Sequence, residues 1–122
     1  VPGGQGTRRE INNPAMVEWI ASIAANAELV LSVCTGSFLL AKAGLLAGLT
    51  ATTHHHTFDV LRELAPDSTV VEDQRFVDNG KIVTSGGISA GIDMSLHIVA
   101  RLLGEETAVR TARYMEYDGK WR

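Results

Sequence analysis

The chain has 122 residues, 45% of them hydrophobic and 20% charged, and its 11 basic and 14 acidic side chains leave a formal net charge of −3. This composition is typical of one folded domain and argues against an intrinsically disordered chain. No basic cluster is longer than Arg8-Arg9, which argues against nucleic acid as a direct partner. No apolar run approaches the ~20 residues that cross a bilayer, and no signal peptide opens the chain, so we expect a cytoplasmic protein without a membrane partner.

The first six residues, VPGGQG, are typical of the exit from a strand into a glycine-rich turn. Because the strand itself is missing, the chain is expected to be a piece of a longer domain. Gly3 and Gly4 can bring bare backbone N–H groups close to a ligand and form an oxyanion pocket, or they can form a plain surface turn. After them, Asn13 and Pro14 predict the cap and first turn of an amphipathic helix that lies on a sheet.

Residues 29–33 (LVLSV) predict a buried strand, and Cys34 follows it directly at the start of a helical run that we expect to continue through Leu46. This is the layout of a nucleophile elbow, in which a sharp strand-to-helix turn exposes one side chain beside the first free N–H groups of a helix. Those groups favour a thiolate. The only cysteine of the chain could instead be a buried, inert thiol, but ligands bind at the carboxyl ends of parallel strands, which favours a reactive Cys34.

Alternating strands and helices continue along the rest of the chain, which predicts an α/β fold with a mostly parallel sheet covered by helices. The predicted elements are a strand at 50–54, a helix stopped by Pro66, a short edge strand at 70–72, strands at 75–78 and 81–84 joined by a two-residue turn at Asn79-Gly80, and a helix after the glycine-rich turn at 85–91. That helix carries apolar residues on two faces, so it is expected to be buried on both sides. Glu105 and Glu106 then open a last helix.

Three consecutive histidines, His54, His55 and His56, raise the question of a metal site. Adjacent residues of a strand point to opposite faces, so at most His54 and His56 share a side, and one cysteine does not complete a zinc site. We therefore predict no metal, and expect a single histidine, His54, near the thiol.

The run Gly87-Ile88-Ser89-Ala90-Gly91 matches the G-x-S-x-G elbow of serine hydrolases. The only histidine after it, His97, lies on the same predicted helix and cannot easily swing back to the serine. The alternative that we favour is structural, with the glycines allowing a tight turn and Ser89 capping the long helix.

Four segments, in this order and spacing, resemble the ThiJ/PfpI superfamily of class I glutamine amidotransferase-like proteins: VPGGQG at 1–6, VCTG at 33–36, ATTH at 51–54 and TSGGISAGID at 84–93. The likeness is greatest to isonitrile hydratases and to the sensor domains of AraC-type regulators. It implies a flavodoxin-like three-layer sandwich in which residues 1–122 form a single domain, the C-terminal two thirds of the usual one, with the N-terminal βαβ part absent. It also implies a homodimer, for which Tyr117 and Trp121 on an exposed tail would be suitable contacts.

The resemblance implies an active site around Cys34 as nucleophile. The backbone N–H groups of Gly4 and Thr35 would form the oxyanion pocket, and His54 would lie near the sulfur. Other pocket residues would be Gly3, Gly36, Gly87 and Ile88. The acid that partners the cysteine in the family comes from the absent N-terminal part, and no cofactor is implied. Related peptidases carry a histidine directly after the cysteine, so Thr35 argues against protease chemistry.

From this resemblance we expect a cysteine-dependent hydro-lyase that hydrates a small-molecule isonitrile to an N-substituted formamide, with Cys34 and Thr35 as catalytic residues. Two alternatives stay open at this point. The chain could be a non-catalytic ligand-sensing domain of an AraC-type regulator, or it could carry out glyoxalase-type or deglycase-type aldehyde chemistry on the same cysteine.

Overall fold

The computed structural model describes residues 1–122 and shows a mixed α/β fold. Its central sheet has the order β1-β5-β4, with β1 (Val30–Val33) parallel to β5 (Ile82–Ser85) and β4 (Phe76–Asp78) antiparallel to β5. A second, two-stranded parallel sheet pairs β2 (Thr50–Ala51) with β3 (Thr69–Val70). The predicted α/β class and the parallel pairing are therefore confirmed.

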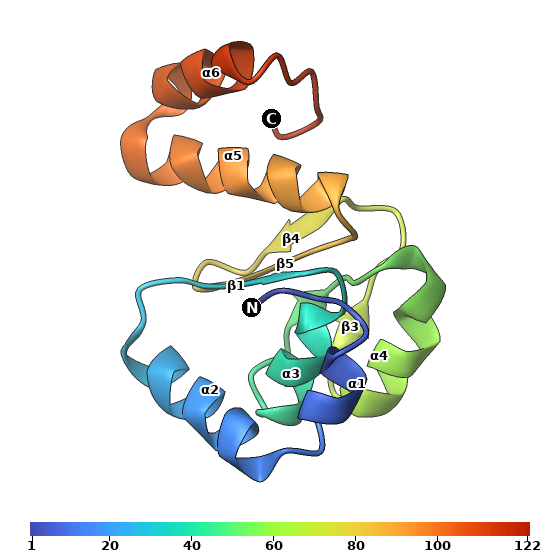
Figure 1. Cartoon of the computed structure of the whole chain (residues 1–122). Helices are drawn as coiled ribbons and strands as arrows, with labels where there is room; N and C mark the ends of the chain where they lie inside the picture. Colours follow the sequence, from blue (N-terminus) through green and yellow to red (C-terminus); the bar gives the residue numbers. More distant parts are fainter.

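Helices cover both sides of the central sheet (Figure 1). On one side lie α1 (Thr7–Glu10), α2 (Pro14–Asn26), α3 (Ser37–Lys42) and α4 (Phe58–Leu64). On the other side lies α5 (Ser89–Leu103), and α6 (Glu105–Tyr114) packs on the outer face of α5. None of these helices combines the length and the apolar character that spanning a membrane requires.

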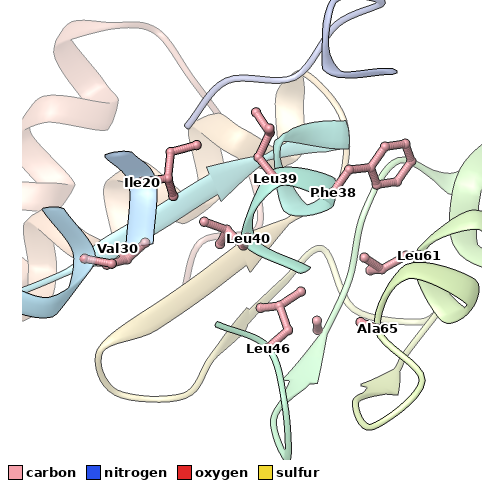
Figure 2. Close-up of a cluster of buried hydrophobic side chains, with 10 residues drawn as sticks. Ile20, Val30, Phe38, Leu39, Leu40, Leu46, Leu61 and Ala65 are labelled. Carbon is pink, nitrogen blue, oxygen red and sulfur yellow. The ribbon is translucent and has the colours of Figure 1, made fainter. Parts of the chain in front are cut away.

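The larger hydrophobic core lies between the central sheet and the first group of helices (Figure 2). Phe38, Leu39 and Leu40 of α3 are all buried in it, together with Val30 of β1 and Leu61 of α4. Because α3 directly follows the turn that carries Cys34, this packing holds the end of that turn against the sheet.

The predicted cap of α2 is confirmed, since the Asn13 side chain accepts the Met16 N–H at 3.4 Å and Pro14 is the first helical residue. Ile20 and Ala24 face the core, whereas Trp19 is 60% exposed. Trp19 and Ile20 both line an apolar groove of about 560 Å³ that runs along β1.

The two-sided burial predicted for the long helix α5 is also confirmed. On the sheet side, Met94 and Ile98 pack against Val83 of β5. On the opposite side, Leu96 packs with Ala108 and other residues of α6. The middle of this helix is thus fixed between two layers.

The helix predicted after Cys34 differs from the one observed. Residues Cys34–Gly36 form a 3₁₀ turn, α3 then runs only to Lys42, and Leu46 is buried but lies beyond the helix. Apolar spacing alone cannot distinguish a helix from successive turns that bury the same side chains.

Two strand predictions also need correction. The predicted strand at 50–54 is limited to two residues, Thr50 and Ala51, because Thr52 donates its N–H to the Thr84 side chain rather than to a neighbouring strand. The hairpin turn consists of Gly80 and Lys81, one residue later than predicted, since the Asn79 N–H pairs with the Ile82 carbonyl at 3.0 Å. The Asn79 side chain also donates to the Thr50 carbonyl at 2.8 Å, a contact that no local pattern reveals.

The C-terminal tail was expected to be exposed, and for Trp121 this is wrong. Trp121 is only 6% exposed because it packs against Leu96, Ala108 and Ala112. Tyr117 is half-buried, with its hydroxyl bound within the fold. Trp121 is therefore not available as the exposed dimer contact that was expected.

Candidate active site

Cys34 lies at the carboxyl end of β1, in the sharp turn between this strand and α3. Its φ of 57° is unusual for a residue other than glycine, as in the elbow predicted from the sequence. Hydrogen bonds hold its backbone there, because its N–H donates to the Gly86 carbonyl at 3.2 Å and its carbonyl accepts the Thr53 hydroxyl at 2.9 Å. The half-buried thiol itself has no hydrogen-bond partner among the residues of the chain.

The glycine-rich start of the chain lies directly against this turn. The Val1 amino group donates to the Leu31 carbonyl at 2.7 Å, and the Val33 N–H donates to the Val1 carbonyl at 3.1 Å. This is the hydrogen-bond pattern of two parallel strands, so Val1 pairs with the edge of β1 that β5 does not occupy. A Cβ at Gly3 would lie 2.8 Å from the Cβ of Cys34, so only glycine fits there. Gly36 is equally close to the same segment, since a Cβ on it would lie 2.3 Å from the Val1 carbonyl oxygen.

Thr35 ties the glycine-rich turn to the elbow. Its buried hydroxyl accepts the Gly4 N–H at 3.0 Å and the Thr7 hydroxyl at 3.1 Å. The Gly4 N–H, expected to bind an oxyanion, is therefore engaged by Thr35 Oγ1. The Gly3 N–H has no partner within the chain, and the Thr35 N–H begins a 3₁₀ turn, where the first N–H groups lack intrahelical acceptors. These two N–H groups have no hydrogen-bond partner within the chain and belong to the two segments that meet at Cys34.

His54 lies in the segment between β2 and α4, next to the turn after β5. Its Nδ1 accepts the His56 N–H at 3.1 Å, so a neutral His54 ring carries its proton on Nε2. Burial first, and then the charges of the two following histidines and of Arg8, lower the pKa of His54 below its usual 6.5. The ring packs against Gly87, where a Cβ would lie 2.7 Å from the His54 Cδ2 atom.

A polar pocket of about 360 Å³ opens where the strand-to-helix turn after β5 meets the His54 segment. Gly87 and Ile88, both expected near the site, line it together with His54 and Arg75. Ile88 has φ 44° and ψ −91°, so the turn after β5 contains a strained residue just as the turn after β1 does.

The rival serine-hydrolase arrangement is not assembled. His97 Nε2 lies 2.7 Å from Asp78 Oδ2, so the histidine pairs with the Asp78 carboxylate and not with the Ser89 hydroxyl. Burial opposes ionisation of Asp78, but the hydrogen bonds from His97 and the Gly80 N–H and the charge of Arg101 prevail and lower the pKa of Asp78 below 3.8.

The expectation that Ser89 caps α5 is also wrong, because Ile88 holds the cap position and no side-chain cap is formed. Ser89 Oγ instead accepts Nη2 of Arg75 at 3.0 Å. No group of three or more His, Cys, Asp or Glu side chains is arranged to hold a metal ion.

Sequence reasoning missed a network centred on Asp93, which is fully buried at the start of α5. Its Oδ1 accepts the Tyr117 hydroxyl at 3.1 Å and the Lys120 N–H at 2.8 Å, and its Oδ2 accepts Nε of Arg75. The one sequence signal for this network was an aspartate within an apolar helical pattern. The hydrogen-bond partners of Asp93 lie 18 to 27 residues away in the sequence, so no local pattern could identify them.

Comparison with known proteins identifies the family of the chain. A model of the DJ-1/PfpI family matches residues 1–101. The chain belongs to the DJ-1/PfpI family. Its place in this family agrees with the resemblance inferred from the four sequence motifs.

Among the relatives of this DJ-1/PfpI chain is isonitrile hydratase from Pseudomonas putida, 43% identical over 117 residues, which cover 96% of this chain and 50% of that protein. The HTH-type transcriptional regulator CdhR from Pseudomonas aeruginosa is 34% identical over 99 residues, covering 81% of this chain and 29% of that protein. A ThiJ/PfpI family protein from Pseudomonas syringae has a solved structure that matches with a TM-score of 0.86 and 31% identity, covering 97% of this chain and 48% of that one. The chain thus spans half or less of the length of these relatives.

Proposed function

We propose that the protein is a cysteine-dependent hydro-lyase similar to isonitrile hydratase, with Cys34 as its nucleophile. The observation that carries this proposal is the conformation of Cys34, which is held at a positive φ at the carboxyl end of β1 by hydrogen bonds to Gly86 and Thr53. The 43% identity to the Pseudomonas putida isonitrile hydratase supports the choice of reaction. Nucleophilic cysteines of this kind depend on a geometry that exposes the sulfur beside backbone donors.

In the proposed reaction, the Cys34 thiolate attacks the terminal carbon of R–N≡C, and that carbon takes a proton from a carboxylic acid. The product is a thioimidate, S–CH=N–R. Water then adds to the same carbon, and breakage of the C–S bond releases the formamide R–NH–CHO and regenerates the thiol. No carboxyl group of residues 1–122 hydrogen-bonds the sulfur, so the acid is the one component of this mechanism for which the chain offers no candidate.

The hydrogen bonds of Thr35 suggest a positioning role. Because its hydroxyl already binds Gly4 and Thr7, it would hold the glycine-rich turn in place rather than hold the incoming water. The Gly3 and Thr35 N–H groups would then stabilise the charge that develops on the adduct.

The test is hydration of cyclohexyl isonitrile, followed by formamide production, with the protein expressed from its complete reading frame. We expect turnover by the wild type and none by Cys34→Ala, with Thr35→Ser close to wild type because serine keeps the hydroxyl. Equal activity of the wild type and Cys34→Ala would refute the proposal. Turnover of methylglyoxal without glutathione, in the absence of isonitrile hydration, would favour aldehyde chemistry on the same thiol instead.

A second candidate is ligand sensing without catalysis. It is supported by the match to the regulator CdhR over 81% of this chain. In that case the Cys34→Ala variant would bind the ligand as tightly as the wild type, as measured by calorimetry. Catalysis instead predicts that the thiol forms a covalent adduct, visible as a mass increase on Cys34.

A further inference from the structure

The β4–β5 hairpin contains the only Asn-Gly sequence of the chain, Asn79-Gly80. An asparagine followed by glycine is chemically unstable, because glycine has no side chain to hinder attack of its backbone nitrogen on the asparagine side chain. In that attack a bond forms between the Gly80 nitrogen and Cγ of Asn79, and the side-chain amide leaves as ammonia. Water then opens the resulting succinimide ring at one of its two carbonyl carbons, which leaves aspartate or isoaspartate at position 79.

The Asn79 side chain joins the two sheets of the fold. Its Nδ2 donates to the Thr50 carbonyl at 2.8 Å and its Oδ1 accepts the Thr50 N–H at 3.3 Å, so it binds both backbone groups of the first residue of β2, as a neighbouring strand would. The same Nδ2 donates to the carbonyl of Ile82, the first residue of β5, at 3.2 Å. One side chain therefore fastens the central sheet to the sheet formed by β2 and β3.

Native hydrogen bonds restrain both groups that take part in this reaction. The Gly80 N–H, which is the attacking group, donates to Asp78 Oδ1 at 2.7 Å. The Asn79 amide, which is the group under attack, is held by its bonds to Thr50 and Ile82, so its Cγ cannot turn toward the Gly80 nitrogen unless these bonds break. The closed hairpin therefore slows a reaction that its sequence favours, and local opening of the hairpin permits it.

The product of the reaction cannot restore the contact between the sheets. An ionised aspartate side chain has only acceptors, whereas the Thr50 and Ile82 carbonyls, to which asparagine donates, need donors. A negative charge would then face two carbonyl oxygens that have lost their donor, which is unfavourable. Isoaspartate also inserts an additional carbon into the backbone, which disturbs the pairing of position 79 with Ile82 across the turn.

We propose that Asn79 is a deamidation site that reacts when the β4–β5 hairpin opens. While the hairpin is closed, position 79 stays asparagine and the two sheets stay joined. Once the hairpin opens, conversion to aspartate or isoaspartate makes the loss of this contact irreversible. Water is the only co-reactant and ammonia is released, so the reaction needs no enzyme or cofactor. The proposal does not depend on Cys34 or on the reaction proposed for it.

The first test measures the rate of deamidation. Wild-type protein is incubated at mildly alkaline pH, in native buffer and in urea that unfolds it, and the peptide that contains residue 79 is analysed by mass spectrometry over time. We expect conversion in native buffer to be at least about tenfold slower, because three side-chain hydrogen bonds oppose the opening that the reaction requires. Gly80→Ala should slow the reaction in urea, where its effect on folding does not matter. Equal rates of the wild type in native buffer and in urea would overturn the proposal.

The second test measures the consequence of the conversion. Asn79→Asp should unfold at a urea concentration about 1 M lower than the wild type. Asn26→Asp is the matched control, since it makes the same chemical change at an exposed asparagine without a side-chain hydrogen bond, and it should shift the midpoint little. Equal midpoints of the two variants would show that Asn79 does not join the sheets.

Wild-type protein that has been deamidated in urea and returned to native buffer gives a measurement that does not need the Asn79→Asp variant to fold. Hydrogen exchange of the backbone at residues 50–53 should be faster in this protein than in unmodified protein treated with urea only briefly, because β2 has lost its contact with the hairpin. Failure of the deamidated molecules alone to refold would likewise support the proposal. Unchanged exchange at residues 50–53 would contradict it.

Discussion

Replacing Asp93 by asparagine tests whether its network holds the start of α5 to the C-terminal tail. Asp93 is fully buried, and asparagine has nearly the same shape, so the substitution changes hydrogen bonding and charge without creating a cavity. The Oδ1 atom of asparagine can still accept the Tyr117 hydroxyl and the Lys120 N–H. The amide nitrogen, however, replaces Oδ2 and places a donor opposite Nε of Arg75, which is also a donor.

The expected cost follows from these bonds. Losing a hydrogen bond between charged groups costs about 1.5–3 kcal/mol, and leaving the buried amide N–H without an acceptor adds about 1–3 kcal/mol. The Arg75 side chain is 40% exposed and can recover some hydration, which lowers the sum. We therefore expect Asp93→Asn to reduce the free energy of unfolding by about 3 kcal/mol at pH 7.

Urea unfolding measures this loss, with tryptophan fluorescence as the signal, because Trp121 is buried close to the network. Asp118→Asn is the control, since Asp118 is exposed on the same tail and makes no hydrogen bond through its side chain; it should change stability by less than about 0.5 kcal/mol. A loss below about 1 kcal/mol for Asp93→Asn, or one equal to that of the control, would show that the network does not hold these segments together.

Three further outcomes are expected. Gly3→Ala should destabilise the protein by about 1–3 kcal/mol and slow the alkylation of Cys34 by iodoacetamide, because the added Cβ would lie 2.8 Å from the Cys34 Cβ. Gly6→Ala is the control and should have neither effect, because its Cβ would have no neighbouring atom closer than 3.9 Å. Burial opposes ionisation of Asp78, yet its hydrogen bonds lower its pKa in the folded protein, so its stabilising effect is present above about pH 4 and is lost as the pH falls further. Acid unfolding of Asp78→Asn should therefore be less steep than that of the wild type below about pH 4, and identical profiles would contradict this. Trp121→Ala should cost about 3–5 kcal/mol in urea unfolding, and a loss below about 1 kcal/mol would mean that the tail is not packed as described.

Local patterns in the sequence determined most of the elements around the candidate site. The Asn13 cap and the proline after it predict α2 because both act within one helical turn. A buried apolar run followed directly by Cys34 predicts the strand and the sharp turn. A strand joined to a helical segment without a linker requires the backbone to turn sharply at the residue between them. The two apolar faces of α5 predict its position between two layers, since apolar side chains on both faces need cover on both.

Only the tertiary structure decided which polar groups are free and which are engaged. The Gly4 N–H, which the motif offers as an oxyanion donor, is bound by Thr35 Oγ1, 31 residues away. Asn79 shifts the hairpin turn by one residue while its side chain bonds the carbonyl of Thr50, and Trp121 is buried by α6 instead of exposed on a tail. The physical reason is the same in each case. A hydrogen-bond donor or an apolar ring takes whichever partner the fold brings near, and residues far apart in the chain become neighbours only after the sheet and helices have packed.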